Sequence, residues 1–223
     1  MKIVVPQFPG TNCEFDTKYA FERLGHEVRI VWHEDETIPA DTELVVVPGG
    51  FSYGDYLRSG AIARFSPIMK AVKAYADNGG YVLGICNGFQ ILLESHLLPG
   101  AMKRNENLHF VSKHQYLKVE NIDNRFLRRC KKGEILNIPI AHAEGNYFIE
   151  EEGLKKLHEN GQVLLTYCNS KGEPDNPNGS VDNIAGICNS ERNVFGLMPH
   201  PERAIEAILG SDDGIKMLEG FIS

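Results

Sequence analysis

The stretch Tyr81-Val-Leu-Gly-Ile-Cys-Asn-Gly-Phe-Gln90 decides how this chain is organised. It opens with a short apolar run typical of a strand, and an apolar-periodic segment, residues 89–98, follows the cysteine. Cys86 lies between Gly84 and Gly88, and glycine on both sides permits a sharp turn. We therefore predict a strand, a tight turn and a helix, with a thiol at the corner.

A cysteine at such a corner is either a nucleophile or a small buried hydrophobic residue. A strand-to-helix turn lifts a nucleophile out of the sheet and sets the N–H groups of the first helical turn beside it. The partial positive charge of the helix start favours the thiolate over the thiol. A lone cysteine is more often a packing residue. The flanking glycines and a histidine motif downstream nevertheless favour a nucleophilic Cys86.

The histidine motif is Pro199-His-Pro-Glu202. A thiol attack needs a base, and the base needs a partner that fixes its tautomer. Pro201 favours an extended backbone at His200, so the side chains at positions 200 and 202 project the same way. We predict that Glu202 orients the His200 imidazole and that this imidazole acts on Cys86. A surface turn containing proline is the competing interpretation.

Two further features fit acyl-transfer chemistry. The backbone N–H of Asn87, directly after the cysteine, and one at Gly49 or Gly50, after an apolar strand, are candidate oxyanion donors. Gln90 lies four residues after Cys86, hence on the same helical face, where it could hold a polar substrate. An ordinary Gly-Gly turn and an exposed helical glutamine are the plainer alternatives.

Strand-like and helix-like patterns alternate along the chain, as in α/β proteins. The runs expected to be strands are residues 2–5, 26–32, 43–47, 81–85, 162–167, 184–188 and 194–198. Asn12 is expected to cap a helix that reaches residue 24, and residues 59–78 are helical in composition with a break at Pro67. This order predicts a mostly parallel sheet with helices on both faces.

The middle of the chain follows a different pattern. Residues 114–121 and 134–140 alternate in polarity, which predicts a small antiparallel insertion around residues 102–150. Further helices are expected at residues 151–160 and near 212–222, and the polar residues 169–183 are expected to form an exposed loop. Because we find no repeat or linker, residues 1–223 are predicted to form a single domain.

Composition argues against several classes of protein. The net charge is −7 and the longest basic cluster is Arg128-Arg-Cys-Lys-Lys132, so a nucleic-acid surface is not expected. No stretch approaches the roughly 20 apolar residues of a membrane span, and we expect no signal peptide. Five widely spaced cysteines suit reduced thiols in the cytoplasm. The sequence contains no zinc-binding or phosphate-loop motif.

These residues resemble a known family. Gly84-Ile-Cys-Asn-Gly88, with Pro48-Gly-Gly50 and His200-Pro-Glu202, is similar to the class I (triad) glutamine amidotransferases. Longer runs resemble, within that family, the glutaminase subunits of phosphoribosylformylglycinamidine synthases. Two such runs are Pro139-Ile-Ala-His-Ala-Glu-Gly-Asn146 and Met198-Pro-His-Pro-Glu-Arg-Ala204. The similar runs span most of the chain.

The resemblance implies a flavodoxin-like fold and the hydrolysis of glutamine to glutamate and ammonia. It implies a γ-glutamyl thioester on Cys86, with His200 as base and then acid, and Glu202 as the carboxylate that orients it. The residues that the resemblance assigns to the oxyanion or to glutamine are Gly50, Asn87, Gln90 and Asn105. Ala143 stands where we expect a glycine, and Ser59 where alanine or cysteine is usual.

The resemblance also implies partners. ATP, magnesium and formylglycinamide ribonucleotide would bind a separate synthetase subunit, which uses the ammonia and is often joined by a small third subunit. This chain would then need no cofactor or metal of its own. We expect the loops at residues 51–58, 143–146 and 176–180 to face the partner, although such polar, glycine-rich loops are equally typical of a free surface.

Other functions fit parts of the pattern. A cysteine hydrolase of the DJ-1/PfpI type also carries its cysteine on a strand-to-helix turn, but such proteins place a histidine at or near the next position, where this chain has Asn87. A thiol redox sensor needs only a reactive cysteine and has no use for His200 and Glu202. The complete set of three residues makes a silent scaffolding subunit the least favoured alternative.

Overall fold

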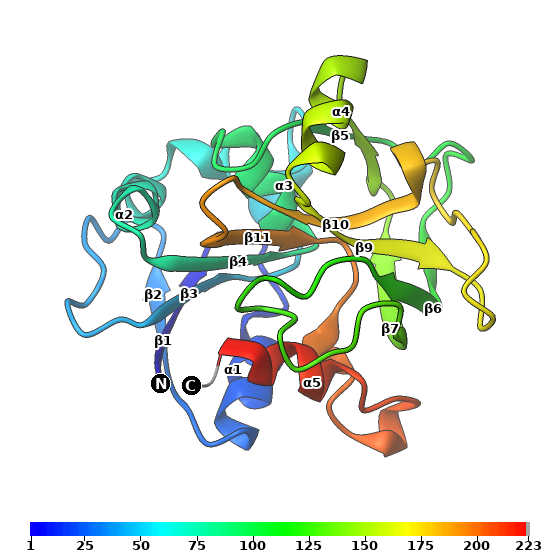
Figure 1. Ribbon diagram of the computed structural model, residues 1–223. Coiled ribbons are helices and arrows are strands. Elements are labelled where there is room, and N and C mark those ends of the chain that lie inside the picture. Colours follow the sequence, from blue (N-terminus) through cyan, green and yellow to red (C-terminus); the bar gives the residue numbers. More distant parts are fainter. Residues whose placement is uncertain (222–223) are drawn as a thin grey trace.

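A computed structural model describes residues 1–221. Within them, helices lie on both faces of one large sheet: Figure 1 shows α1 and α5 below it, and α2, α3 and α4 above it. The helices are α1 (Glu14–Arg23), α2 (Pro67–Asp77), α3 (Asn87–Glu94), α4 (Glu151–Glu159) and α5 (Gly214–Leu218). The layered arrangement confirms the predicted α/β class.

The large sheet contains nine strands within residues 1–221, in the order β2-β1-β3-β4-β11-β10-β9-β6-β7. They are β1 (Lys2–Gln7), β2 (Glu27–Trp32), β3 (Leu44–Val47), β4 (Tyr81–Ile85), β6 (Val111–Val119), β7 (Ile135–His142), β9 (Val163–Cys168), β10 (Ile184–Cys188) and β11 (Val194–Leu197). Strands β2, β1, β3, β4 and β11 are parallel, in the order typical of flavodoxin-like sheets. The other four continue the sheet antiparallel.

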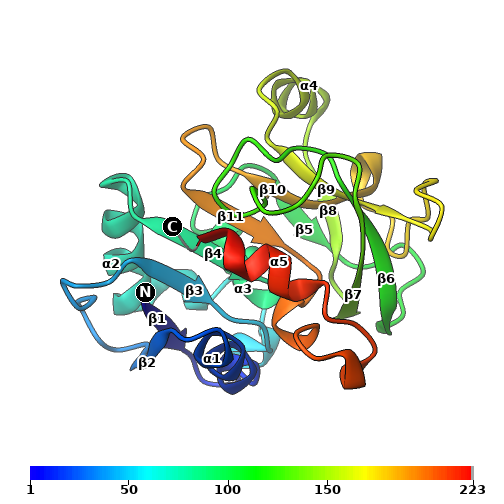
Figure 2. The ribbon, with the colours of Figure 1, turned by 60° about the horizontal axis from the view of Figure 1, so that its bottom comes forward.

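The antiparallel insertion joins the main sheet. Strands β6 and β7 pair with each other, and β6 pairs with β9, so the predicted pair of strands is confirmed as the outer part of the same sheet (Figure 2). Strands β5 (Ala101–Lys103) and β8 (Asn146–Phe148) form a separate two-stranded sheet. The N–H of His200, beyond β11, donates to the carbonyl of Pro139 on β7 at 2.8 Å. The insertion therefore reaches the region around His200.

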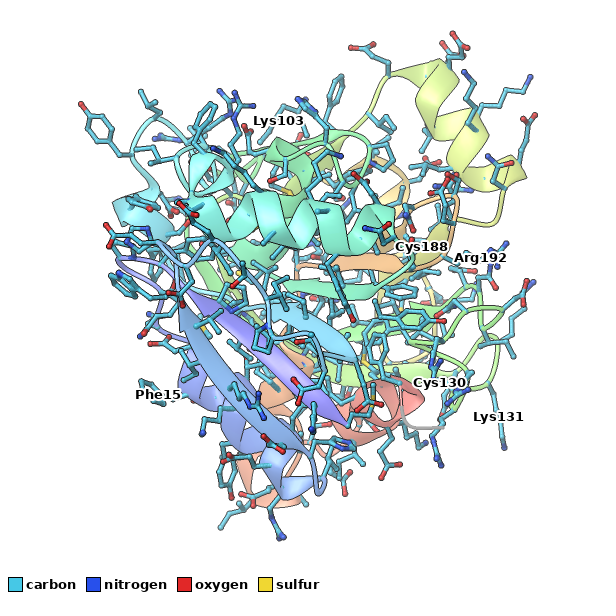
Figure 3. All side chains as sticks on the ribbon, turned by 90° about the vertical axis from the view of Figure 1, so that its left-hand side faces the viewer. Phe15, Lys103, Cys130, Lys131, Cys188 and Arg192 are labelled. Carbon is cyan, nitrogen blue, oxygen red and sulfur yellow. The ribbon has the colours of Figure 1, made fainter. Side chains whose placement is uncertain are left out.

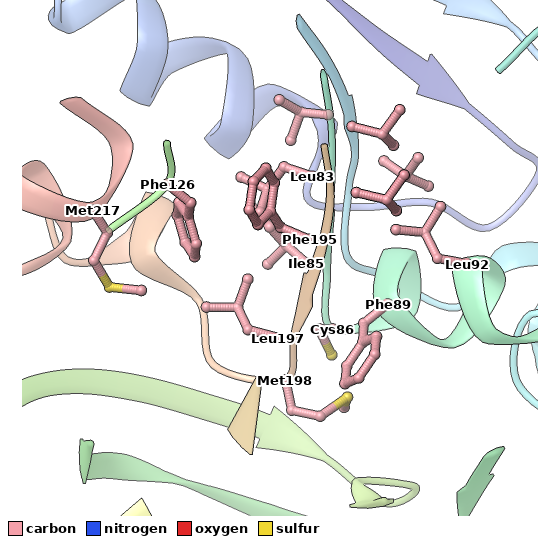
Figure 4. Close-up of a cluster of buried hydrophobic side chains, with 14 of the residues drawn as sticks. Leu83, Ile85, Cys86, Phe89, Leu92, Phe126, Phe195, Leu197, Met198 and Met217 are labelled. Atoms are coloured by element: carbon pink, nitrogen blue, oxygen red, sulfur yellow. The ribbon is translucent and has the colours of Figure 1, made fainter. Parts of the chain in front are cut away.

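Apolar side chains from the sheet and from the helices on both of its faces form the core. The residues of β3 are fully buried, as in a parallel strand covered on both faces. Figure 4 shows Phe89 and Leu92 of α3 beside the strands that carry Leu83 and Phe195. Gly88 permits this contact, because a Cβ there would overlap the carbonyl oxygen of Val47 on β3. The start of α3 is thereby fixed directly against the sheet.

Two predictions about helix starts are wrong. Cys13, not Asn12, occupies the N-cap position of α1, and no side chain caps that helix. The Oδ1 of Asn12 instead accepts a hydrogen bond from the Cys13 thiol at 3.2 Å. Pro67 does not interrupt a helix but begins α2, a position where its missing N–H costs little. Residues 59–66 form turns and a short 3-10 segment.

The sequence predicted that residues 169–183 form an exposed loop, and for two of these residues the prediction is wrong. Asn178 and Ser180 are buried. Asn178 is held inside because its Nδ2 donates to Nε2 of His142 at 3.0 Å. The helix predicted near residues 212–222 is shorter: α5 ends at Leu218 and a 3-10 turn follows to residue 221. Residue 222 lies outside the described residues.

The cysteines and the basic cluster agree with the sequence analysis. All five cysteines are free, and Figure 3 shows Cys130 and Cys188 on separate segments. In the basic cluster, Arg129 donates to the carbonyl of Glu219 at 3.1 Å, so the cluster helps to hold the C-terminal segment. Lys131 is exposed. No helix within residues 1–221 has both the length and the apolar character to cross a membrane.

The side chain of Asn193, at the amino end of β11, links this strand to α2 and to the turn before β4. Its Nδ2 donates to the carbonyls of Ala76 at 2.8 Å and Gly80 at 2.9 Å. Asn193→Leu should lower the free energy of unfolding by about 1–3 kcal/mol, because two main-chain carbonyls lose a donor. Urea unfolding should show a lower midpoint at an unchanged slope. An unaltered midpoint would contradict the structural role of this amide.

Candidate active site

Cys86 occupies the turn between β4 and α3. Its backbone angles, φ 50° and ψ −106°, are rare for a residue other than glycine. Turns of this kind present nucleophiles at the top of α/β sheets. A Cβ at Gly84 would lie 2.6 Å from Cδ1 of Leu92 and 2.8 Å from the carbonyl oxygen of Gly88, so bulkier residues would push the helix away. The predicted strand, turn and helix with a thiol at the corner are confirmed.

The thiol borders a small cavity at the carboxyl ends of the parallel strands. The cavity has a volume of about 110 Å³ and is lined by Asn12, Cys13, Gly50, Phe51, Cys86, Phe110, Ala141, His200 and Arg203. Several of these residues follow β1, β3, β4 and β11 directly. Strands β1 and β3 are neighbours at the point where the strand order reverses. Open α/β sheets bind their ligands at this position.

His200 and Glu202 form a buried pair at the edge of this cavity. The Nδ1–H of His200 donates to Oε1 of Glu202 at 2.6 Å, and the two residues are 1% and 2% exposed. Strand β11, which precedes them, pairs with β4 so that Leu197 lies beside Ile85. This register brings His200 to the same edge of the sheet as Cys86. Among the described residues, Nε2 of His200 has no hydrogen-bond partner.

Two opposing effects act on the His200 imidazole. Burial by itself lowers the pKa of His200, whereas the Glu202 carboxylate and the Cys86 sulfur raise it, and the net pKa lies well above the ordinary value. The raised pKa favours an imidazolium beside the thiol. An imidazolium can hold a neighbouring cysteine as its thiolate and later give a proton to a leaving group.

The candidate oxyanion donors flank the thiol. Asn87 is the first residue of α3, so its N–H has no acceptor within the helix. Gly50 lines the cavity with φ 137°, and a Cβ there would lie 2.7 Å from the backbone nitrogen of Asn12. Gly49, the other candidate, packs against the imidazole: a Cβ there would lie 2.9 Å from Cε1 of His200. Gly50 therefore fits an oxyanion role better than Gly49.

Gln90 is buried near the thiol but does not line the cavity. Its Oε1 accepts a hydrogen bond from Nδ2 of Asn87 at 2.9 Å, and its Nε2 donates to the carbonyl of Glu144 at 2.6 Å. The side chain thus connects the start of α3 to the loop after β7. A contact with glutamine through Gln90 stays a prediction.

Asn105 is fully buried and also lies outside the cavity lining. Its Nδ2 donates to the carbonyls of His109 at 2.8 Å and His142 at 2.9 Å, and its Oδ1 accepts from the N–H of Gly145 at 2.9 Å. Its own N–H donates to the carbonyl of Ala143, so alanine at that position keeps this backbone contact. A substrate contact through the amide nitrogen of Asn105 would require one of these bonds to open.

His142 is a second buried histidine close to the site. Burial and the charge of His200 lower the pKa of His142 to about 3, so this imidazole is neutral. Its Nε2 accepts the hydrogen bond from Asn178, which assigns the ring proton to Nδ1. His142 therefore contributes no charge to the cavity.

Several residues of the site were missed from the sequence. Ala141 directs its carbonyl at the thiol of Cys86, 3.7 Å away, and Nη2 of Arg203 donates to the sulfur of Cys13 at 3.1 Å. The signal for Cys13 was its place just beyond the first strand, because the carboxyl ends of parallel strands share one edge. Nothing in the sequence marked Ala141, which comes from the antiparallel insertion.

Cys13, His200 and Glu202 offer a sulfur, a nitrogen and an oxygen within 4.8 Å of one another, which is a possible set of metal ligands. Burial, and next the charge of Glu202, raise the pKa of Cys13, so its sulfur stays a thiol, which is a poor ligand. The short bond between His200 and Glu202 also occupies one atom of each. A site without metal stays our prediction.

Known proteins resemble the chain along its full length. A model of the family described as CobB/CobQ-like glutamine amidotransferase domain matches residues 1–213. A relative from Sulfurimonas denitrificans, named phosphoribosylformylglycinamidine synthase subunit PurQ, is 69% identical over 222 residues, which are 100% of this chain and 99% of the relative. A relative of the same name from Campylobacter jejuni is 60% identical, over 100% of this chain and 96% of the relative.

Solved structures agree with the fold. A chain of the structure described as PurLQS from Thermotoga maritima matches with a TM-score of 0.89 and 41% identity, over 99% of this chain and 97% of that chain. A glutamine amidotransferase from Thermotoga maritima matches with a TM-score of 0.59 and 15% identity, over 92% of this chain and 77% of that chain. The second likeness shows a shared fold alone.

The Glu202 carboxylate should set the protonation of His200. Glu202→Gln keeps an acceptor for the Nδ1–H but removes the charge, so the pKa of His200 should fall, as a nitrogen-15 NMR titration would measure. The proton on His200 stabilises the fold at low pH and this contribution is lost as the pH rises through the raised pKa. In the variant it should be lost at a lower pH.

Glu206→Gln is the matched control, because it removes the same charge from a carboxylate that bonds Tyr19 instead. The pKa of His200 should be unchanged in this variant. If Glu202→Gln left the pKa of His200 where it is in the unaltered chain, the carboxylate would not be the cause of the shift.

Proposed function

Because the chain belongs to the CobB/CobQ-like glutamine amidotransferase domain family, we propose that it hydrolyses glutamine to glutamate and ammonia. The ammonia goes to a synthetase subunit that converts formylglycinamide ribonucleotide to formylglycinamidine ribonucleotide in purine biosynthesis. The observation that carries this proposal is the identity, over the whole chain, to relatives named as a subunit of phosphoribosylformylglycinamidine synthase.

The first half of the proposed reaction forms a thioester. The Cys86 thiolate attacks the γ-amide carbon of glutamine, and the negative charge moves to the amide oxygen. The N–H groups of Asn87 and Gly50 stabilise this oxyanion, and each such donor contributes about a hundredfold or more in rate. The His200 imidazolium gives its proton to the amide nitrogen. The C–N bond breaks, ammonia leaves and a γ-glutamyl thioester remains on Cys86.

The second half of the proposed reaction releases glutamate. His200, now neutral, takes a proton from a water molecule, whose oxygen attacks the thioester carbon. The same two N–H groups stabilise the second oxyanion. When the C–S bond breaks, glutamate leaves and the pair of thiolate and imidazolium is restored. Glu202 keeps its charge throughout and holds the imidazole in one tautomer.

Gln90 and Asn105 complete the proposed site. Gln90 lies on the face of α3 that carries Cys86, which supports our proposal that it contacts the amino-acid end of glutamine. Asn105 is proposed to contact the same end, for which one of its hydrogen bonds to backbone groups would have to open. Both assignments follow from the family resemblance.

Partners and cofactors follow from the same proposal. The synthetase subunit, with a small third subunit, receives the ammonia, which agrees with the likeness to a chain of the PurLQS structure. ATP and magnesium are proposed to bind the synthetase, since this sequence contains no phosphate-loop motif. We propose the cytoplasm as its location, where five free thiols stay reduced.

No observation favours the other candidate functions. The family match covers most of the chain and names glutamine amidotransferases, not DJ-1/PfpI hydrolases. A redox sensor would leave the buried pair of His200 and Glu202 without a role. We therefore retain neither alternative.

The loops expected to face the synthetase lie next to one another, which supports a shared docking surface. They are residues 51–58, 143–146 and 176–180. Ser59, just after the first loop, donates its N–H to Oε2 of Glu144 at 3.2 Å. A Cβ at Gly179 would lie 3.0 Å from Nδ2 of Asn146, so the other two loops are also in contact. We propose that this surface, beside the cavity, receives the synthetase.

Cys86→Ala should separate the two activities of the assembled complex. Synthesis that depends on glutamine should be lost, because no thioester can form. Synthesis from added ammonia should persist, because the synthetase is intact. Coupled assays with each nitrogen source measure the two rates. Loss of both rates together would refute ammonia delivery as the role of this chain.

Leu57→Asp should weaken binding of the synthetase. Leu57 is 81% exposed on the first of these loops, next to Tyr56, which is 71% exposed, and apolar surface gains free energy when a partner covers it. Arg58 is a poorer choice because it already bonds both carboxylate oxygens of Glu94. Ile208→Asp is the control, since Ile208 is 91% exposed but lies outside the three loops. Equal affinities of the two variants, measured by titration calorimetry, would contradict the proposed surface.

A further inference from the structure

The side chain of Asn87 is a polar group that the proposed mechanism does not use. The residue is 1% exposed, and only its backbone N–H is assigned to the oxyanion. Its Oδ1 accepts a hydrogen bond from the N–H of Ser52 at 3.0 Å, and its Nδ2 donates to Oε1 of Gln90 at 2.9 Å. A longer contact of 3.4 Å joins Nδ2 to Oδ1 of Asp55. The amide therefore joins the loop after β3 to the first turn of α3.

Ser52 connects this amide to the second oxyanion donor. It lies two residues after Gly50, in a loop whose backbone is unusual: φ is 53° at Tyr53, 53° at Asp55 and 71° at Leu57. Non-glycine residues hold such conformations only where the surroundings enforce them. The bond from Ser52 to Asn87 is one of the contacts that fix this loop against α3.

The two oxyanion donors come from different segments of the chain. One N–H belongs to the loop after β3 and the other to the first turn of α3, so their spacing depends on contacts between the segments. A functional group of this kind must be held to within about 0.5 Å of its productive position. The hydrogen bond at 3.0 Å between Ser52 and Asn87 joins these two segments directly.

Gln90 extends this row of hydrogen bonds to the loop after β7. It accepts from Asn87 and donates to the carbonyl of Glu144, in the loop that follows Ala141. The carbonyl of Ala141 faces the Cys86 sulfur at 3.7 Å. One row of hydrogen bonds thus joins the loop after β3, the start of α3 and the loop after β7.

We propose that the Asn87 side chain is a positioning residue for the oxyanion. It holds the N–H of Gly50 and its own N–H at the spacing that one tetrahedral oxyanion requires. It does so through Ser52, and it does not touch the substrate. This inference rests on the proposed function and extends it, because it assigns a role to a side chain whose backbone alone had one.

Asn87→Leu in the assembled complex tests this role. The variant keeps the helix and the backbone N–H but removes the bond to Ser52 together with the bond to Gln90. We expect kcat for glutamine hydrolysis to fall by about tenfold or more, with KM within about twofold, because the lost interaction acts on the transition state. Alkylation of Cys86 by iodoacetamide should continue at its original rate, since that displacement develops no oxyanion.

A merely structural amide would give a different pattern. If kcat for glutamine and the alkylation rate fell together, Asn87 would support the thiol or the fold, and the proposal would be overturned. An unchanged kcat would overturn it as well. Asn193→Leu is the matched control. It removes another buried asparagine amide, one with two main-chain bonds, at the end of β11 that lies away from His200 and the cavity. It should lower stability and leave kcat unchanged.

Ser52→Pro removes the same hydrogen bond from the other side. Ser52 is the first residue of a 3-10 turn, where the ring of proline is tolerated. We expect kcat to fall here too with retained alkylation, and the double variant should be no slower than Asn87→Leu alone, because both variants remove the bond from Ser52. Additive losses would overturn the proposal. An unaltered complex that is alkylated at Cys86 but does not hydrolyse glutamine would instead refute the proposed function.

Discussion

The site depends on the contact between the first turn of α3 and strand β3. A Cβ at Gly88 would overlap the carbonyl oxygen of Val47, so only glycine lets the helix begin this close to the sheet. The closeness forces the preceding residue, Cys86, into a backbone conformation that few L-residues adopt. The core beneath, with Phe89 and Leu92 packed on the strands, supplies the energy that holds the strained turn.

The burial of His200 and Glu202 makes the interaction between their charges important for the site. A carboxylate as buried as Glu202 keeps its charge only if a cation or hydrogen-bond donors compensate it. Its Oε1 receives the Nδ1–H of His200, while its Oε2 has no partner among the described residues. His200 is therefore the group that faces the carboxylate most directly, and the Arg203 guanidinium interacts with it as well. Against the effect of burial, the Glu202 carboxylate raises the pKa of His200, which favours the imidazolium that a reactive thiol requires beside it.

The sequence was sufficient for features that rest on local backbone rules. The turn at Cys86 followed from its flanking glycines. The pairing of His200 with Glu202 was also expected, but residues 201–203 form a 3-10 turn and not the extended backbone from which the pairing was argued. One local prediction failed. Asn12 was expected to cap α1, yet its side chain accepts a hydrogen bond from the thiol of the adjacent Cys13.

Other features could not be predicted because they depend on tertiary contacts. Asn105 is engaged by backbone groups of the loop after β7, a segment that no local pattern places beside it. Ala141 reaches Cys86 only because the insertion continues the main sheet through β9. The glutamine-binding role assigned to Asn105 follows from the family resemblance and stays a prediction.

Strand β11 lies in the middle of the sheet although β5 to β10 all precede it in the chain. It is inserted between β4, which leads to the thiol, and β10, so the imidazole cannot meet the sulfur until the chain as far as residue 200 is available. Contacts of such long sequence separation form late in folding. An incomplete chain emerging from the ribosome therefore carries an ordinary cysteine, and the reactive pair arises only when the fold closes.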